Sequence, residues 1–151
     1  MYGSKYIESI IQTPKGIYGL DTDAKRIWRL SSNGFEVISD NFINSFLQKN
    51  INLSIANNSV NYSTENRKIV STHYNAHKQD IMFTIYDTNS TSWNICYNEL
   101  LQRWVTFYSW VPLVSCNINN IMYTFDAQNT GETNWLYKHN VGAQPCYWYG
   151  E

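Results

Sequence analysis

Short apolar runs separated by polar stretches fill the chain, and one arrangement of them occurs three times. In each copy an apolar run ends at Asp, a polar stretch follows, and Trp stands in a second apolar run. Runs of this length predict a strand, a turn and a returning antiparallel strand. The copies are Gly16–Leu30 with Asp21 and Trp28, Ile81–Tyr97 with Asp87 and Trp93, and Ile121–Tyr137 with Asp126 and Trp135.

The repeat predicts an all-β fold of stacked antiparallel hairpins. A hairpin buries little apolar surface alone, so repeated hairpins favour copies that stack on one another, most commonly as a β-propeller. We therefore expect a single propeller-like domain over residues 1–151. Propellers have about four to eight four-stranded blades, so three hairpins do not close one. The units could share blades, other chains could complete the ring, or the domain could be a segment of a larger ring-forming protein.

One short helix is expected after the first copy. Ser32-Asn33-Gly34 predicts a tight turn into a third strand at Phe35–Ser39. Asp40 then suits the N-cap of a helix over residues 40–49. The helix would pack on the sheet through one apolar stripe of Phe42, Ile43, Phe46 and Leu47.

The segment Trp104–Val111 is apolar on both faces of a predicted strand. Strand alternation places Trp104, Tyr108 and Trp110 on one face. The opposite face would carry Val105, Phe107 and Val111, and Pro112 would end the strand. Such a strand needs cover on both sides, as stacked sheets provide.

Composition excludes several classes of function. With 11 Lys and Arg against 12 Asp and Glu, the chain lacks the basic excess of a nucleic-acid surface. No apolar run approaches the ~20 residues of a membrane span, and the first residues, which include Glu8, do not read as a signal peptide. The three cysteines, Cys96, Cys116 and Cys146, are odd in number and widely spaced, which favours reduced thiols in a protein made in the cytoplasm.

No catalytic, cofactor or metal site is predicted. His73 and His77 have the spacing of a helical metal pair, but no third ligand is near, and a polar loop at 73–79 is the better interpretation. Nucleophile motifs, phosphate loops and a facing carboxylate pair are missing from the sequence, and Glu99 reads as part of a hairpin connection. The repeated Asp residues are interpreted as turn braces, whose carboxylates accept backbone N–H groups.

Aromatic residues, 16% of the chain, are the remaining candidates for binding. Such side chains could stack on sugars, but Trp and Tyr more often belong to cores or protein interfaces. We therefore predict a protein interface at the C-terminal Tyr147, Trp148 and Tyr149, with glycan binding as the alternative. The aromatic residues considered for a sugar platform are Tyr108, Trp110, Tyr147, Trp148 and Tyr149.

Several long segments resemble the tail muzzle proteins of crAss-like bacteriophages, which are often labelled stabilization proteins. Together these segments cover most of the chain. They are Lys5–Arg29 (KYIESIIQTPKGIYGLDTDAKRIWR), Phe35–Asp40 (FEVISD), His73–Asp87 (HYNAHKQDIMFTIYD), Trp93–Pro112 (WNICYNELLQRWVTFYSWVP) and Asn117–Asp126 (NINNIMYTFD).

The resemblance implies a propeller-like, non-enzymatic structural protein of the virion tail, made in the host cytoplasm and assembled near the distal tail opening. Its partners would be other tail proteins and copies of itself, and it would need no cofactor. The family offers no catalytic residues to carry over. Two alternatives stay open from the residues alone: a glycan-binding adhesion module, and a remnant of a propeller-type glycoside hydrolase.

Overall fold

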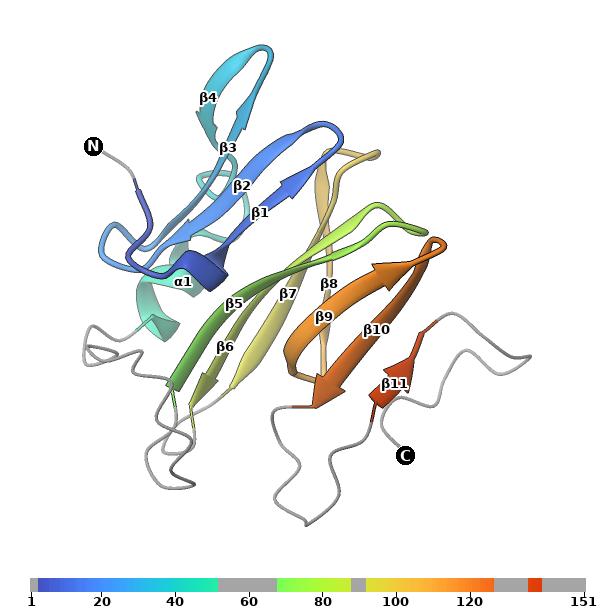
Figure 1. Ribbon diagram of the computed structural model, residues 1–151. Helices are drawn as coiled ribbons and strands as arrows, with labels where there is room; N and C mark the ends of the chain where they lie inside the picture. Colours follow the sequence, from blue (N-terminus) through green and yellow to red (C-terminus); the bar gives the residue numbers. More distant parts are fainter. Residues whose placement is uncertain (1–2, 52–67, 88–91, 127–135, 140–151) are drawn as a thin grey trace.

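The computed structural model describes residues 3–51, 68–87, 92–126 and 136–139. Within these residues the protein is mostly β, with eleven strands in three antiparallel sheets and one short α-helix (Figure 1). The predicted all-β class is confirmed. No helix in this part of the chain is both long and apolar enough to cross a membrane.

The first sheet contains the first four strands in chain order and follows a 3-10 turn at Ile7–Ser9. The predicted tight turn between its last two strands is confirmed, since Ser31 pairs with Gly34. Gly34 has φ of 101°, a conformation that glycine adopts at little cost. The strands are β1 (Ile10–Thr13), β2 (Gly16–Asp21), β3 (Arg26–Ser31) and β4 (Gly34–Val37).

The second and third sheets repeat this meander. The predicted repeat hairpins are β2–β3, β6–β7 and β10–β11, all antiparallel, so each expected strand pair is confirmed. The second sheet contains β5 (Lys68–Asn75), β6 (Asp80–Asp87), β7 (Trp93–Asn98) and β8 (Arg103–Tyr108). The third contains β9 (Pro112–Ile118), β10 (Ile121–Asp126) and β11 (Leu136–Lys138).

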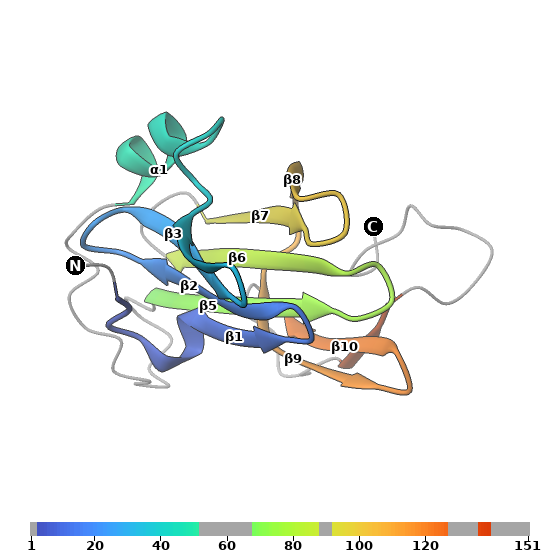
Figure 2. The same cartoon turned by 90° about the horizontal axis from the view of Figure 1, so that it is seen from above.

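The three sheets are stacked in chain order, with the second sheet between the first and the third (Figure 1). The first strand of each sheet lies next to the first strand of the following one, because β1 contacts β5 and β5 contacts β9 (Figure 2). The described strands do not close into a ring. Closure of a propeller therefore stays a prediction.

The main core lies between the first and second sheets. Tyr18, Leu20 and Ile27 of the first sheet pack there against alternate residues of β6 and β7. The intervening residues Met82 and Cys96 face the third sheet, where they pack with Trp110 and Met122 in a second core. All eight residues of β6 are buried, which explains why that strand reads as almost uninterruptedly apolar. The main-core residues of the second sheet include Ile81, Phe83, Ile85, Trp93, Ile95 and Tyr97.

The predicted helix is present as α1 (Asn44–Asn50), and it begins later than Asp40. Asp40 does not cap it, because its carboxylate pairs with Arg26 Nε at 2.7 Å. Phe42 consequently falls outside the apolar stripe and is 94% exposed, with φ of 78°. Ile43 and Leu47 are buried in the main core, and Phe46 packs against it.

The predicted assignment of side chains to the two faces of β8 is wrong, because a β-bulge at Val105 interrupts the alternation. Trp104 pairs with Tyr97, whereas Thr106 pairs with Cys96, so one extra residue lies between them. Trp104 therefore packs on the main core and Tyr108 on the second core, instead of sharing a face. Pro112 begins β9 rather than ending β8, a position where its missing N–H costs no ladder bond.

Candidate interaction surfaces

Asp21 at the end of β2 fixes the turn that follows it. Its Oδ1 accepts hydrogen bonds from the backbone N–H groups of Asp23 (3.0 Å) and Ala24 (2.8 Å). Its Oδ2 accepts one from the Gly3 N–H at 2.9 Å, which attaches the N-terminal segment to the first sheet. At this position the carboxylate has the geometry of a turn brace.

Trp28 lies across β2, opposite Gly19. A Cβ at Gly19 would stand 2.3 Å from the indole, so the close approach of strand and ring requires glycine. The indole Nε1 donates to the Gly3 carbonyl at 3.0 Å, and the ring stacks on Phe35 at 5.7 Å. Trp28 is thereby buried on the face of the first sheet that points away from the second.

Trp93 occupies the corresponding strand position in the second sheet. It is buried in the main core, pairs with Ile85 and packs edge-to-face on Phe46 at 5.3 Å. Asp87 is buried at the end of β6, and its backbone N–H donates to Ser92 Oγ at 3.0 Å.

The first two copies share their register. Trp28 lies opposite the residue two before Asp21, and Trp93 lies opposite the residue two before Asp87. In the third copy the residue two before Asp126 is Thr124, which lies opposite Tyr137. Trp135 and the side chain of Asp126 lie outside the described residues, as do Tyr147, Trp148 and Tyr149. The equivalence of all three Asp–Trp pairs stays a prediction.

Glu99 joins the first and second sheets, a role that the sequence did not indicate. The carboxylate is almost fully buried and accepts hydrogen bonds from the hydroxyls of Thr13, on β1, and Tyr74 (3.4 Å), on β5. Its backbone N–H donates to the Gln79 carbonyl at 2.8 Å. Because Thr13 is far away in the sequence, no local pattern could have revealed this contact.

The predicted loop at 73–79 is wrong at its start, because His73 lies in β5 and is buried. Its Nε2 lies 2.8 Å from Ser71 Oγ, and its Nδ1 lies 2.9 Å from Ser115 Oγ on β9. The ring therefore bridges the second and third sheets. Burial lowers the pKa of His73 to about 4. His77 is exposed in the following turn, so the two histidines do not form a pair.

His139 is a second buried histidine at the same junction. Its Nε2 lies 2.6 Å from Thr124 Oγ1, and its ring stacks on Trp110 at 4.9 Å. Burial, with a smaller contribution from the charge of Lys78, lowers the pKa of His139 to about 4. The described residues contain no group of three or more His, Cys, Asp or Glu side chains placed to hold a metal ion.

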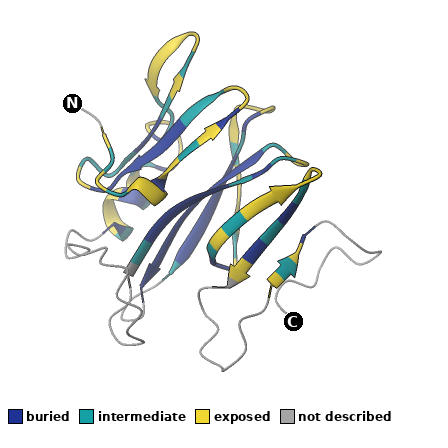
Figure 3. Cartoon of the chain, in the orientation of Figure 1, coloured by how far each residue is buried: buried dark blue, intermediate teal, exposed yellow. Residues whose placement is uncertain are grey.

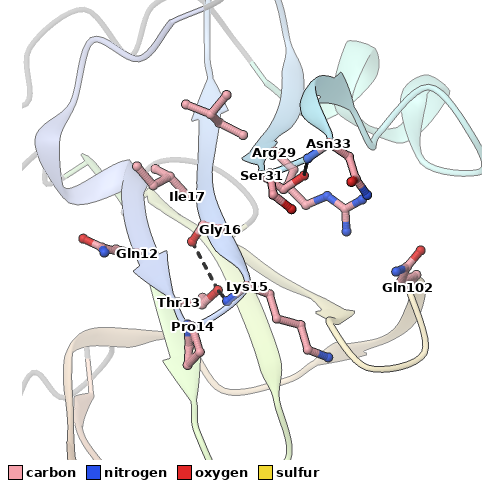
Figure 4. Close-up of a pocket in the computed structure, with 12 residues that line it drawn as sticks. Gln12, Thr13, Pro14, Lys15, Gly16, Ile17, Arg29, Ser31, Asn33 and Gln102 are labelled. Carbon is pink, nitrogen blue, oxygen red and sulfur yellow. Dashed lines mark hydrogen bonds between the residues drawn. The ribbon is translucent and has the colours of Figure 1, made fainter.

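A cleft of about 550 Å³ lies beside the β1–β2 and β3–β4 turns (Figure 4). Lys15, Arg29 and Gln102 contribute polar groups, but Arg29 already pairs with Glu36 at 2.6 Å and Lys15 Nζ donates to Gln79 at 3.2 Å. Among the described residues that line it there is no Asp, Glu, His, Cys or aromatic side chain. The described lining thus offers hydroxyl and amine groups, but it has no carboxylate or imidazole that could activate them and no aromatic stacking surface.

Two of the five aromatic residues considered for a sugar platform belong to the second core or pack against it. Trp110 is buried in the second core, and Tyr108 packs against it at 5.2 Å between ring centroids. Trp110 therefore offers no exposed ring face, and Tyr108 is half-buried.

Exposed apolar side chains lie on all three sheets, with Val105 and Phe107 on β8 of the second sheet and others on the first and third. Many residues of the first and third sheets are exposed, whereas β6 and β7 between them are mostly buried (Figure 3). We define the outer face of the first sheet as the side pointing away from the second, and the outer face of the third sheet likewise. Strand register places Ile10, Ile17, Trp28, Leu30, Phe35 and Val37 on the former. It places Val114, Cys116, Ile118, Ile121, Tyr123, Phe125 and Leu136 on the latter.

A family model described as Crassvirus muzzle protein matches residues 1–128. A search of curated proteins finds no match to the chain.

Proposed function

This chain belongs to the Crassvirus muzzle protein family, and we propose that it acts there as a non-enzymatic scaffold in a ring-like assembly at the tail opening. Family membership confirms the resemblance found in the sequence and makes the chain a structural protein of the phage virion tail. Its partners are other virion proteins. We further propose that it forms a ring, associates with copies of itself and has no catalytic activity.

One observation carries the proposal: consecutive meander sheets stack face to face in chain order, with their first strands adjacent. Successive blades of a propeller have this arrangement around the propeller axis. The buried faces on both sides of the second sheet support a stack that continues from sheet to sheet.

The scaffold role is further supported by the chemistry of the described clefts and thiols. The described residues that line the cleft beside the β1–β2 turn include no Asp or Glu, whereas hydrolysis of a glycoside needs a pair of carboxyl groups. Cys96 and Cys116 are free thiols, consistent with synthesis in the reducing host cytoplasm. The buried position of Trp110 gives no support to the glycan-binding alternative.

Mass spectrometry of density-purified virions tests the proposal, together with electron microscopy of particles labelled with an antibody to this chain. We expect several copies per virion and label at the distal end of the tail. A matched antibody to a capsid protein should label heads only. Detection of the chain in infected-cell lysate, with none in purified virions, would contradict the proposal.

A further inference from the structure

Two adjoining clefts lie where the β1–β2, β3–β4 and β7–β8 turns come together at one end of the first and second sheets (Figure 1). The first is the cleft of about 550 Å³ beside the β1–β2 turn (Figure 4). The second, of about 220 Å³, is lined by residues of β4 and by the start of β8. Arg29 and Gln102 line both clefts. The two clefts therefore form one continuous groove, which we call the rim groove.

The rim groove is positively charged, although the chain as a whole has a net charge of −1. Its described lining contains the cations Lys15, Arg29 and Arg103 but a single acid, Glu36. Glu36 pairs with Arg29 at 2.6 Å and so compensates that charge. Lys15 and Arg103 are exposed, and Lys15 Nζ donates to the neutral side chain of Gln79 at 3.2 Å. The described lining thus keeps positive charge that its one carboxylate does not neutralise.

The second cleft has the surroundings of a site for an extended polypeptide. β4 ends the first sheet and β8 ends the second, so each has a backbone edge without a partner among the described strands. Trp104 Nε1 donates to the Ile38 carbonyl at 3.1 Å, which holds the end of β4 beside β8. The Trp104 ring packs on Tyr97 at 5.1 Å and on Phe83 at 5.9 Å, so it is a fixed wall of the cleft. Extended peptides bind to such edges through their backbone and to neighbouring walls through their side chains.

We propose that the rim groove binds an extended, acidic segment of another virion protein. Side chains alternate along an extended segment, so carboxylates at every second position can face Lys15, Arg29 and Arg103. The backbone of the segment is available to pair with a free strand edge. An acidic sugar offers the same carboxylates but lacks backbone groups for that edge. This inference rests on the proposed scaffold function, which supplies the virion partners.

Peptide binding to the full chain is the first test. The probe is a fluorescent, end-capped peptide of sequence Glu-Thr-Glu-Val-Glu-Thr-Glu, and its control has Lys in place of each Glu. In fluorescence polarisation we expect saturable binding of the Glu peptide and binding at least about tenfold weaker for the Lys peptide, because like charges repel. Added NaCl should weaken the binding, since it screens exposed charges. Equal binding of both peptides, or binding of neither, would overturn the proposal.

Single substitutions show whether the rim groove is the site. Arg103→Gln and Lys15→Gln each remove one exposed charge and should weaken binding about two- to fivefold. Lys49→Gln removes the same charge from an exposed position of α1 outside the groove and should leave binding unchanged. Glu36→Gln should tighten binding about twofold, because it frees the Arg29 guanidinium for a ligand carboxylate. Loss of folding does not produce such a gain, and circular dichroism checks each variant. An equal loss in Lys49→Gln and Arg103→Gln, or weaker binding by folded Glu36→Gln, would contradict the proposal.

Amide NMR and an acidic sugar separate strand docking from general attraction of anions. We expect the Glu peptide to shift the amide resonances of β4, Gln102 and Arg103 and to leave those of β10 unchanged. Tetragalacturonate has four carboxylates, as the peptide has, and should bind more weakly. Tighter binding of the sugar would overturn the proposal in favour of a glycan site. If the chain is present in virion tails and binds no acidic peptide, the docking site fails and the tail function stands; a chain that binds the peptide and is missing from virions gives the opposite result.

Discussion

The second sheet and the two outer sheets are built alike, yet they differ in how they are covered. β6 is buried at every position, because the first sheet packs on one side of it and the third sheet on the other. The first and third sheets each have one covered face and one apolar face with exposed residues. In a sheet with one face exposed to solvent, apolar and polar residues normally alternate along each strand. The outer sheets therefore carry apolar residues on faces where polar ones are normally expected, and we predict that other protein covers these faces in the virion.

The largest difference between these regions should appear in stability. Replacing Phe83, fully buried in the second sheet, by Ala removes a core ring and should lower the free energy of unfolding by about 3–5 kcal/mol. Val114→Ala, on the outer face of the third sheet, should cost under about 1 kcal/mol in the monomer. Urea denaturation at low protein concentration measures both. Equal losses at the two positions would remove the distinction between covered and uncovered sheets.

Acid should weaken the junction between the second and third sheets. His73 and His139 have pKa values of about 4 in the folded chain and about 6.5 when unfolded. Between these pH values the unfolded chain therefore binds more protons than the folded chain. The contribution of the two neutral histidines to the free energy of unfolding is fully present above about pH 6.5 and is lost as the pH drops towards 4. The loss should reach up to about 3 kcal/mol for each histidine.

Urea midpoints at pH 7.5, 5.5 and 4.5 measure this loss, and His73→Gln should flatten the profile. His77→Gln, which changes an exposed turn residue, should leave the profile as it is. A flat wild-type profile between pH 7.5 and 4.5 would show that the two buried rings do not hold the junction.

The contact of Trp28 with Gly19 should give a smaller loss of stability, and that loss should depend on whether the indole ring is present. Gly19→Ala places a methyl group against the indole and should cost about 1–3 kcal/mol. In a Trp28→Ala background the same change should cost much less, because the ring that it meets is gone. A double-mutant cycle measures the coupling. Additive losses would mean that the strand adjusts and that glycine is not required there.

The smallest effect is expected at Phe42, which lies outside both cores. Its φ of 78° is strained for an aromatic residue, and the side chain is exposed. Phe42→Gly should therefore leave stability unchanged or raise it by up to about 1 kcal/mol, since relief of strain offsets the added backbone freedom. Phe42→Ala, which keeps the strain, is the matched control. A large loss in both variants would show that the ring packs on the domain.

The sequence predicted the hairpins well because their signals are local. An apolar run ending at Asp, with Trp across the turn, and the Asn33-Gly34 pair each act within a few residues. The family resemblance is likewise carried by continuous segments and is confirmed. Features that depend on distant contacts were missed. The burial of Glu99 depends on Thr13 and Tyr74, and the place of His73 in β5 depends on Ser115 from another sheet.

The bulge in β8 was missed for a different reason. One additional residue, Val105, reverses the facing of every later side chain in the strand, and an apolar strand gives no polar position to reveal the reversal. The position of Phe42 was missed because the Asp40 carboxylate pairs with Arg26 instead of capping the helix. A charge pair between a strand residue and a later turn competes with local capping, and the tertiary fold decides which of the two forms.

The most direct test of the account is a cryo-electron microscopy reconstruction of the tail opening in purified virions. We expect density for three stacked sheets of this chain, with Leu30 and Phe35 on one side and Val114 and Leu136 on the other covered by neighbouring protein. Reconstruction with both outer faces open to solvent, or without this chain at the tail, would contradict the claim that the sheet stack is a structural part of the tail.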